Sequence, residues 1–219
     1  MNSIRAFIFD LDGVVVDTAK YHYLAWKKLA AELGFEFLEK DNERLKGVSR
    51  MDSLNILLEI GGRKATLKEK EKMATRKNGW YLDYIRKMSP DEVLPGAKKF
   101  ILELRQLGFL VGLGSASKNA PLILKQIEMK ELFDTIVDGS RVVNAKPDPE
   151  IFLLAAKDLD VEPKACVVFE DAEAGIEAAI RGGMRCVGVG DARILGRANI
   201  VIPDFEEITV GEVLRTLEG

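Results

Sequence analysis

The stretch that decides the fold is AFIFDLDGVVVDT, residues 6–18, which joins a short apolar run to two carboxylates. The run at 6–9 is typical of a strand buried on both faces of a parallel sheet. Asp10 follows it directly, and Asp12 and Gly13 come two and three positions later. The sequence therefore raises the question of which function requires two carboxylates at the end of a buried strand.

Similar apolar runs recur along the chain, each followed by a helical pattern. We expect strands at 5–9, 109–114, 135–138, 165–169 and 185–189, and helices at 97–107, 120–129, 149–159 and 172–181. This alternation predicts an α/β fold, a doubly wound Rossmann-like parallel sheet with helices on both faces. The stretch 188–199 contains glycines without the order of a dinucleotide-binding fingerprint, and we expect a closing strand and loop there.

Residues 19–89 interrupt the alternation because they hold no convincing strand. Helical spacing of apolar residues appears at 19–34, 49–62 and 66–88, and the segment 89–96 has two prolines and the composition of a linker. The sequence thus predicts an inserted α-helical cap domain at 15–92. The remaining residues, 1–14 and 93–219, are expected to form the α/β core domain.

Composition narrows the class of protein and its partners. The chain has 219 residues and a net charge of −3, and its lysines and arginines are spread along it, so we expect no binding to nucleic acid or membrane. It has no apolar run long enough to span a bilayer and no signal-peptide pattern, and we expect a cytoplasmic monomer. Cys166 and Cys186 have no close cysteine partner, so buried reduced thiols are expected, with a disulfide or metal site as the alternative.

Polar groups lie at four points of the predicted fold, three of them directly after a strand and one before a helix. Asp10 and Asp12 follow the first strand, SASKN at 115–119 follows the second, Lys146 precedes the helix at 149, and Glu170 and Asp171 follow a later strand. Ligands of open parallel sheets bind beyond the carboxyl ends of the strands. We therefore expect these groups to converge at one edge of the sheet.

Converging carboxylates would repel one another and would require a counter-ion. Oxygen ligands of this kind suit Mg²⁺, which also binds substrate phosphate, and SASKN offers hydroxyls, a lysine and backbone N–H groups to an anion. Together these parts predict phosphoryl transfer to an aspartate. Each acidic pair alone is better explained as a turn, a helix cap or a partner of a helix dipole, so only the ordered coincidence of all four groups favours catalysis.

The same residues resemble a known family. FDLDGVVVDT (9–18), SASKN (115–119), AKPDPEIF (145–152) and FEDAEAG (169–175) resemble the four motifs of the haloacid dehalogenase superfamily of phosphatases and phosphomutases. In the insert, TAKYHYLAWKKLA (18–30), LKGVSRMDSL (45–54) and ATRKN (74–78) resemble the helical cap of the sugar-phosphate mutases in that superfamily. The resemblance implies a phosphomutase that interconverts β-D-glucose 1-phosphate and D-glucose 6-phosphate through a phospho-aspartyl enzyme and β-glucose 1,6-bisphosphate.

The resemblance also implies roles for individual residues. Asp10 would be the nucleophile and Asp12 the general acid and base, and Mg²⁺ would be held by Asp10, the backbone carbonyl of Asp12 and Asp171, with Glu170 close by. Sugar phosphates would be bound by a larger set, namely Thr18, His22, Trp26, Lys46, Gly47, Arg50, Ser53, Lys77, Asn78, Ser115, Ala116, Ser117, Lys118, Asn119 and Lys146. Within that set Ser115, Ala116 and Lys146 would hold the transferring phosphate, and the other phosphate would be held by Arg50, Ser117, Lys118 and Asn119.

Several assignments remain open at this level. An isolated arginine such as Arg50 is often only a solvated helix residue, the single histidine His22 is often a satisfied surface group, and Trp26 fits the cap core as well as a sugar contact. A sugar-phosphate phosphatase is the main alternative function. A phosphonate hydrolase would need a cap lysine that forms a Schiff base, and a non-catalytic binding module would need no working nucleophile.

Overall fold

The computed structural model describes residues 3–45 and 48–218, and the chain divides into two compact units. One unit comprises the residues up to Asp17 together with those from Ser89 onward, and the other is Thr18–Met88. The sheet-bearing unit includes residues 15–17 because Val16 bridges to Asp12 and Val93, and the N–H of Leu94 donates to the Val15 carbonyl at 2.9 Å.

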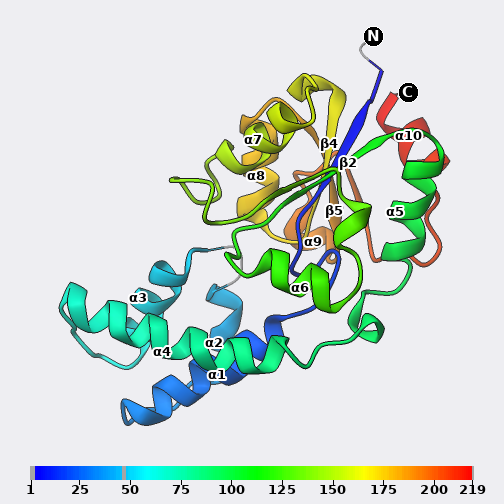
Figure 1. The fold of residues 1–219 in the computed structure, drawn as a ribbon. Helices are drawn as coiled ribbons and strands as arrows, with labels where there is room; N and C mark the ends of the chain where they lie inside the picture. Colours follow the sequence, from blue (N-terminus) through cyan, green and yellow to red (C-terminus); the bar gives the residue numbers. More distant parts are fainter. Residues whose placement is uncertain (1–2, 46–47, 219) are drawn as a thin grey trace. The chain divides into compact units, whose positions relative to one another are not determined.

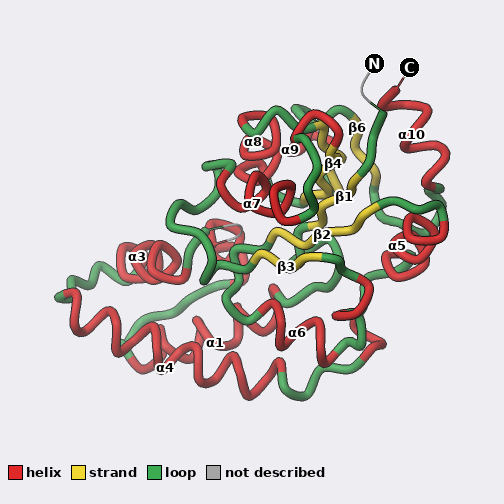
Figure 2. The backbone as a smooth tube through the Cα atoms, turned by 45° about the horizontal axis from the view of Figure 1, so that its top comes forward, coloured by secondary structure: helices red, strands yellow, loops and turns green. Residues whose placement is uncertain are grey.

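The sheet-bearing unit is built on six parallel strands within the described residues (Figures 1 and 2). They are β1 (Ala6–Phe9), β2 (Leu110–Gly114), β3 (Thr135–Val137), β4 (Cys166–Glu170), β5 (Arg185–Val189) and β6 (Ile200–Ile202), in the order β3-β2-β1-β4-β5-β6. The chain builds outward from β1 in one direction and then returns to build from β1 in the other. This doubly wound parallel sheet confirms the predicted fold class.

One part of the strand prediction was incomplete. The segment expected to be a closing strand and loop contains a short helix, α9 (Ala192–Leu195), and the strand β6 that follows was not predicted. With only three residues, β6 is too short to produce a recognisable periodic pattern, and it forms by pairing with β5, where Val189 lies opposite Ile202.

Both faces of the sheet are buried, and neighbouring residues of β1 point to opposite faces. Ala6 and Ile8 lie in a core cluster with residues of α7 (Glu150–Asp158) and α8 (Glu173–Arg181). Phe9 stacks on Phe169 with ring centroids 4.7 Å apart, and both pack near Phe205. Helices α7 and α8 thus cover one face, and α5 (Ala97–Gln106) lies on the other (Figure 1). Two further helices, α6 (Ala120–Gln126) and α10 (Val210–Glu218), complete the described part of this unit.

Among its described residues, the other unit contains helices joined by loops and no strand. Its helices are α1 (Ala19–Glu32), α2 (Glu39–Asn42), α3 (Arg50–Ile60) and α4 (Leu67–Ile85), which include the three predicted from helical spacing. Two N-termini are capped by side chains: the Ser49 hydroxyl accepts from the Asp52 N–H, and Thr66 and Glu69 form a capping box. Apolar faces of α1, α3 and α4 meet in a core of their own.

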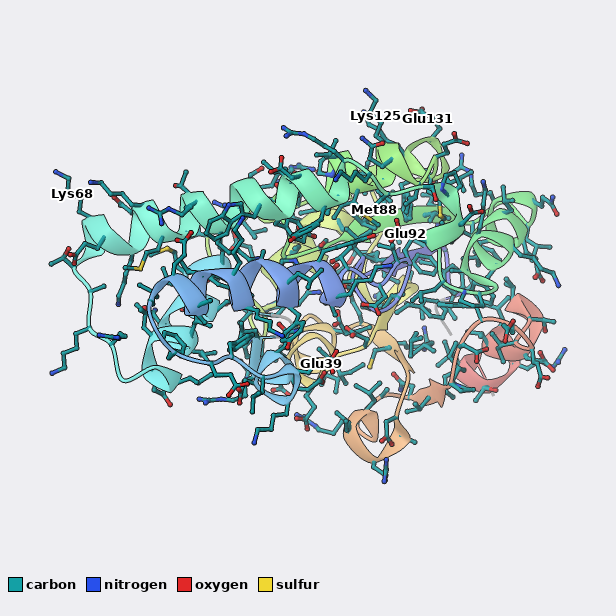
Figure 3. All side chains as sticks on the ribbon, turned by 90° about the horizontal axis from the view of Figure 1, so that it is seen from below. Glu39, Lys68, Met88, Glu92, Lys125 and Glu131 are labelled. Atoms are coloured by element: carbon teal, nitrogen blue, oxygen red, sulfur yellow. The ribbon has the colours of Figure 1, made fainter. Side chains whose placement is uncertain are left out.

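The surface carries charges of both signs. Figure 3 shows Lys68 of α4 and Lys125 of α6 projecting from the ribbon, and ion pairs such as Arg44–Glu59 and Arg76–Glu32 are distributed over the helices. None of the helices in the described part of the chain has the length and hydropathy needed to cross a membrane. Cys166 and Cys186 are free and buried, as predicted, and burial raises the pKa of Cys166 to about 12.

Candidate active site

The centre of the candidate site is a buried ammonium group between two buried carboxylates. Lys146 Nζ lies 2.5 Å from Asp10 Oδ1 and 2.8 Å from Glu170 Oε2, and each of the three residues is at most 6% exposed. Asp10 directly follows β1 and Glu170 ends β4, and the parallel register that sets Phe9 opposite Phe169 brings them side by side. Lys146 comes from the segment between β3 and α7.

The charges of this centre shift one another's pKa values. Burial alone would lower the pKa of Lys146, but Asp10 and Glu170 raise it above its ordinary value, so Lys146 remains an ammonium. Burial raises the pKa of Glu170, and Asp10 adds to the rise while Lys146 opposes it. Burial also raises the pKa of Asp171, with Glu170 and Asp10 as the next causes. The cluster therefore holds more negative charge than one lysine offsets.

A third carboxylate completes an acidic cluster beside the lysine. Asp10, Glu170 and Asp171 each offer an oxygen within 4.8 Å of the others, which is the separation expected of ligands to one cation. Asp171 is accommodated because Gly13 has no side chain: φ at Gly13 is +80°, and a Cβ there would overlap the Asp171 carboxylate. Asp12 is partly buried in the same turn, and its charge contributes to raising the pKa of Asp171.

The segment that carries Lys146 is held by two hydrogen bonds just before the lysine and by an aromatic ring after it. The Glu150 carboxylate accepts from the N–H groups of Val143 and Asn144 at 3.0 and 2.8 Å, which fixes the chain just before the lysine. Lys146 Nζ also lies 4.8 Å from the centroid of the Phe152 ring in α7, and the Lys146–Pro147 peptide between them is cis. The lysine side chain is thus fixed by an aromatic ring as well as by its two carboxylates.

The loop after β2 is organised by its own hydroxyl groups. Ser115 is buried, and its N–H donates to the Val137 carbonyl at 2.9 Å. The Ser117 N–H donates to the Ser115 hydroxyl at 3.2 Å, and the Asn119 N–H donates to the Ser117 hydroxyl at 3.3 Å. Ala116 is partly buried and Lys118 is exposed. Because Phe9 lies opposite Leu113, this loop begins beside the turn that follows Asp10.

The helical unit contains a separate cationic cluster. Lys77 of α4 is 1% exposed, and its ammonium donates to Nδ1 of His22 on α1 at 2.9 Å. The same ammonium lies 4.4 Å from the Trp26 ring centroid and 4.8 Å from that of Tyr81. Burial lowers the pKa of His22 well below its ordinary value, and the positive charges of Lys77 and Arg50 lower it further. His22 is therefore neutral, with Nδ1 as the acceptor.

The other residues of this unit that we expect to bind substrate lie on α3, on α4 and just before α1. Arg50 is the first residue of α3 and is partly buried, and burial lowers the pKa of its guanidinium. Ser53 is buried on the same helix, and Asn78 is partly buried on α4. Thr18 is fully buried and accepts from the Tyr81 hydroxyl at 3.2 Å. Lys46 and Gly47 lie outside the described residues.

Three contacts were missed by the sequence reasoning. Phe152 lies under Lys146, Tyr81 lies 4.1 Å from His22 between ring centroids, and Gly175 lies against Glu170. A local signal existed for Tyr81, which is one helical turn after Lys77 on α4 and hence on the same helix face. For Phe152 and Gly175 the motifs themselves, AKPDPEIF and FEDAEAG, held the residues without indicating their contacts.

Comparison with known proteins identifies the family of the chain. Residues 4–183 match the family model of haloacid dehalogenase-like hydrolases. The chain is 44% identical to a beta-phosphoglucomutase of Bacillus subtilis, over 94% of this chain and 92% of that protein. It superimposes on a crystal structure of beta-phosphoglucomutase from Clostridium difficile with a TM-score of 0.94 and 42% identity, over 98% of this chain and 97% of that one. It is also 30% identical to a phosphorylated carbohydrates phosphatase of Thermotoga maritima, over 98% and 99% of the two chains.

The neutral state of His22 predicts that the helical unit loses stability in acid. Because the pKa of His22 is lowered on folding, the stabilisation is fully present above the unfolded value near 6.5 and is lost as the pH falls below it. The free energy of unfolding should fall by at most about 1.4 kcal/mol per pH unit from this group. Urea unfolding between pH 7.5 and 5.5 can be followed by tryptophan fluorescence, because both tryptophans, Trp26 and Trp80, lie in this unit.

The control is His22→Asn, which keeps a hydrogen-bond acceptor but does not titrate. Its unfolding should depend less steeply on pH than that of the unchanged protein. Equal slopes for the two proteins would show that His22 is not held neutral in the folded state.

Proposed function

Because the chain belongs to the haloacid dehalogenase-like hydrolase family, we propose that it is a phosphomutase that interconverts β-D-glucose 1-phosphate and D-glucose 6-phosphate. The reaction would run through a phospho-aspartyl enzyme and β-glucose 1,6-bisphosphate. The observation that carries the proposal is the buried Asp10 held 2.5 Å from the ammonium of Lys146 at the carboxyl end of β1. The 44% identity to a beta-phosphoglucomutase along most of both chains supports the mutase among the activities of the family.

Asp10 would act as the nucleophile. A carboxylate oxygen attacks the phosphorus of the bisphosphate, an acyl-phosphate bond forms, and the bond between phosphorus and the sugar oxygen breaks. Lys146 keeps its positive charge beside this carboxylate and would stay next to the phosphate oxygens as they move onto Asp10. In the reverse step a sugar hydroxyl attacks the same phosphorus and Asp10 leaves as a carboxylate.

The acidic cluster fits a divalent cation, and we propose Mg²⁺. Three buried or partly buried carboxylates lie beside one lysine, and burial, with the neighbouring carboxylates adding to it, raises the pKa values of Glu170 and Asp171. Asp10, the Asp12 backbone carbonyl, Glu170 and Asp171 would hold the ion, since hard oxygen ligands suit Mg²⁺. When bound, Mg²⁺ neutralises charge on the transferring phosphate.

Asp12 would be the general acid and base. It lies in the turn after β1, two residues beyond the nucleophile, and only part of its side chain is covered. It would give a proton to the sugar oxygen that leaves phosphorus and take a proton from the sugar hydroxyl that attacks it. A positioned acid–base group contributes roughly 10²–10⁴-fold to rate.

The two phosphates of the bisphosphate would have different partners. We assign the transferring phosphate to Ser115, Ala116 and Lys146, because the loop after β2 begins beside the Asp10 turn. We assign the other phosphate to Arg50, Ser117, Lys118 and Asn119, since a planar guanidinium binds two phosphate oxygens at once. The sugar would be bound by the remaining residues of the expected set, namely Thr18, His22, Trp26, Lys46, Gly47, Ser53, Lys77 and Asn78.

The helical unit would serve as the cap domain of the core, and the whole enzyme would be a cytoplasmic monomer that acts on small sugar phosphates. Its own compact core supports this division of labour, since the unit has an apolar cluster built from α1, α3 and α4. The positive charges of Lys77 and Arg50 near the neutral His22 support a role in binding anionic substrates.

A sugar-phosphate phosphatase is the second candidate, favoured by the 30% identity to a phosphorylated carbohydrates phosphatase. The two activities share the phosphoenzyme and differ in its acceptor, which is a sugar hydroxyl in the mutase and water in the phosphatase. Mixing phosphorylated protein with β-glucose 1-phosphate separates them. Bisphosphate and glucose 6-phosphate are expected, and release of free phosphate as the main product would refute the mutase.

Asp10→Asn should abolish phosphoenzyme formation, because an amide is a poor nucleophile. Asp12→Asn should still accept phosphate from acetyl phosphate but should transfer it to sugar roughly 10²–10⁴-fold more slowly. Mass spectrometry of the phosphorylated peptide, with rapid mixing for the transfer step, provides the measurement. Asp160→Asn, a change at an exposed position after α7, is the control and should behave like the unchanged protein. Phosphate found on a residue other than Asp10 would overturn the assignment.

Arg50→Ala should reduce kcat/KM for the mutase reaction by roughly ten- to a hundredfold. Charge-assisted hydrogen bonds contribute about 1.5–3 kcal/mol, and about 1.4 kcal/mol corresponds to a factor of ten. Phosphorylation of Asp10 by acetyl phosphate should change little, because that donor has no second phosphate. Arg50→Lys should restore only part of the loss, since lysine cannot bind two oxygens in the same plane.

The matched control is Arg44→Ala, which removes an exposed arginine of the same unit paired with Glu59. It should leave both reactions unchanged. If Arg50→Ala slows both reactions equally, or neither, then Arg50 does not bind the second phosphate.

A further inference from the structure

Gly175 occupies a position where glycine is not required by the backbone. It lies in the first turns of α8, and it is not among the glycines with positive φ. In an ordinary helix, alanine at such a position is more favourable than glycine, because glycine loses more backbone freedom on folding. Some other constraint must therefore exclude a side chain at residue 175.

The excluded volume belongs to one side chain. A Cβ built on Gly175 would overlap the carboxyl carbon, Oε2 and Cγ of Glu170, and these are its three nearest atoms. No backbone atom comes as near. The missing side chain therefore leaves a space that the Glu170 carboxyl group fills.

The Glu170 carboxyl group has little freedom to move aside. It is 1% exposed, Oε2 accepts from Lys146 Nζ at 2.8 Å, and Oε1 accepts from the Ala172 N–H at 3.2 Å. Displacing it would break its contact with Lys146 and separate it from Asp10 and Asp171. The lysine would then lose one of the two carboxylates that neutralise it.

We propose that Gly175 is a positioning residue, whose absent side chain sets the place of the Glu170 carboxyl group within the acidic cluster. Its consequence for the reaction rests on the proposed Mg²⁺-dependent phosphoryl transfer, but the steric claim does not. Gly175 and Gly13 then have matching roles, since each leaves space for one carboxylate of the cluster. Gly175 has an ordinary helical backbone conformation, whereas Gly13 has a positive φ. A substitution at Gly175 therefore tests the effect of a side chain without straining the backbone.

The test is a cycle of substitutions measured by thermal unfolding in the presence of a chelator. Gly175→Ala is made in the unchanged protein, in Glu170→Gln and in Glu170→Ala. Glutamine has the size of glutamate without its charge, so Gly175→Ala should lower the unfolding temperature in the first two backgrounds. In Glu170→Ala the space is empty, and Gly175→Ala should leave the unfolding temperature unchanged or raise it.

Gly211→Ala is the matched control, because Gly211 lies in α10 of the same unit and a Cβ there meets only Arg215 Nη1 at an ordinary 3.6 Å. It should not lower the unfolding temperature. Equal destabilisation by Gly175→Ala in all three backgrounds would overturn the proposal. If Gly175→Ala alone fails to fold, folding of the Glu170→Ala, Gly175→Ala pair supports the proposal, and failure of that pair overturns it.

A second measurement connects the position to the metal. Calorimetric titration with Mg²⁺ should give an affinity roughly tenfold to a hundredfold weaker for Gly175→Ala than for the unchanged protein, the usual effect of losing a group that orients a ligand. Unchanged affinity would overturn the positioning role. If neither the unchanged protein nor any variant binds Mg²⁺, the proposed function fails. The unfolding cycle still decides whether the absent side chain of Gly175 sets the place of Glu170.

Discussion

The structure of the site depends on one buried interaction, the contact of the Lys146 ammonium with the carboxylates of Asp10 and Glu170. Charges removed from water are tolerated only when they are paired and hydrogen-bonded. The three groups come from distant parts of the sequence, so the pairing forms only once β1 and β4 lie side by side. The fold and the proposed chemistry are therefore coupled. The sheet brings the three charged groups together, and the charge of Lys146 allows acidic residues to be buried at the ends of β1 and β4.

The same constraint explains the residues around the centre. Burial and the neighbouring carboxylates raise the pKa values of Glu170 and Asp171. One ammonium offsets only part of the charge of three carboxylates, which favours binding of a cation. Two glycines, Gly13 and Gly175, lie where side chains would displace the carboxylates. Asp10 is thus buried beside an ammonium group, and the carboxylates next to it have the space that these glycines leave.

Much of this arrangement could be predicted from the sequence, because it is encoded locally. Continuous apolar runs predicted five strands, and the polar residues after them predicted which edge of the sheet carries Asp10 and Glu170. The sequence also predicted that Asp10, Lys146 and Glu170 converge there, but not which atoms pair or which other side chains contact them. One partner of Lys146, Asp10, lies 136 positions away from it in the sequence. The ring of Phe152 beside Lys146 has no distinctive spacing, and β6 forms by pairing with β5 rather than from a pattern of its own. The roles of Arg50 and His22 remain predictions.

The central claim is that Lys146 balances the buried carboxylates, and replacing it tests this most directly. Lys146→Met keeps an unbranched side chain that is one atom shorter and removes its charge, leaving Asp10 and Glu170 without their partner. Removing one member of a buried ion pair costs about 3–5 kcal/mol, so the free energy of unfolding in urea, measured with a chelator, should fall by about that amount. Added Mg²⁺ should restore part of the loss. A fall of less than about 1 kcal/mol, the value typical of an exposed ion pair, would contradict the account.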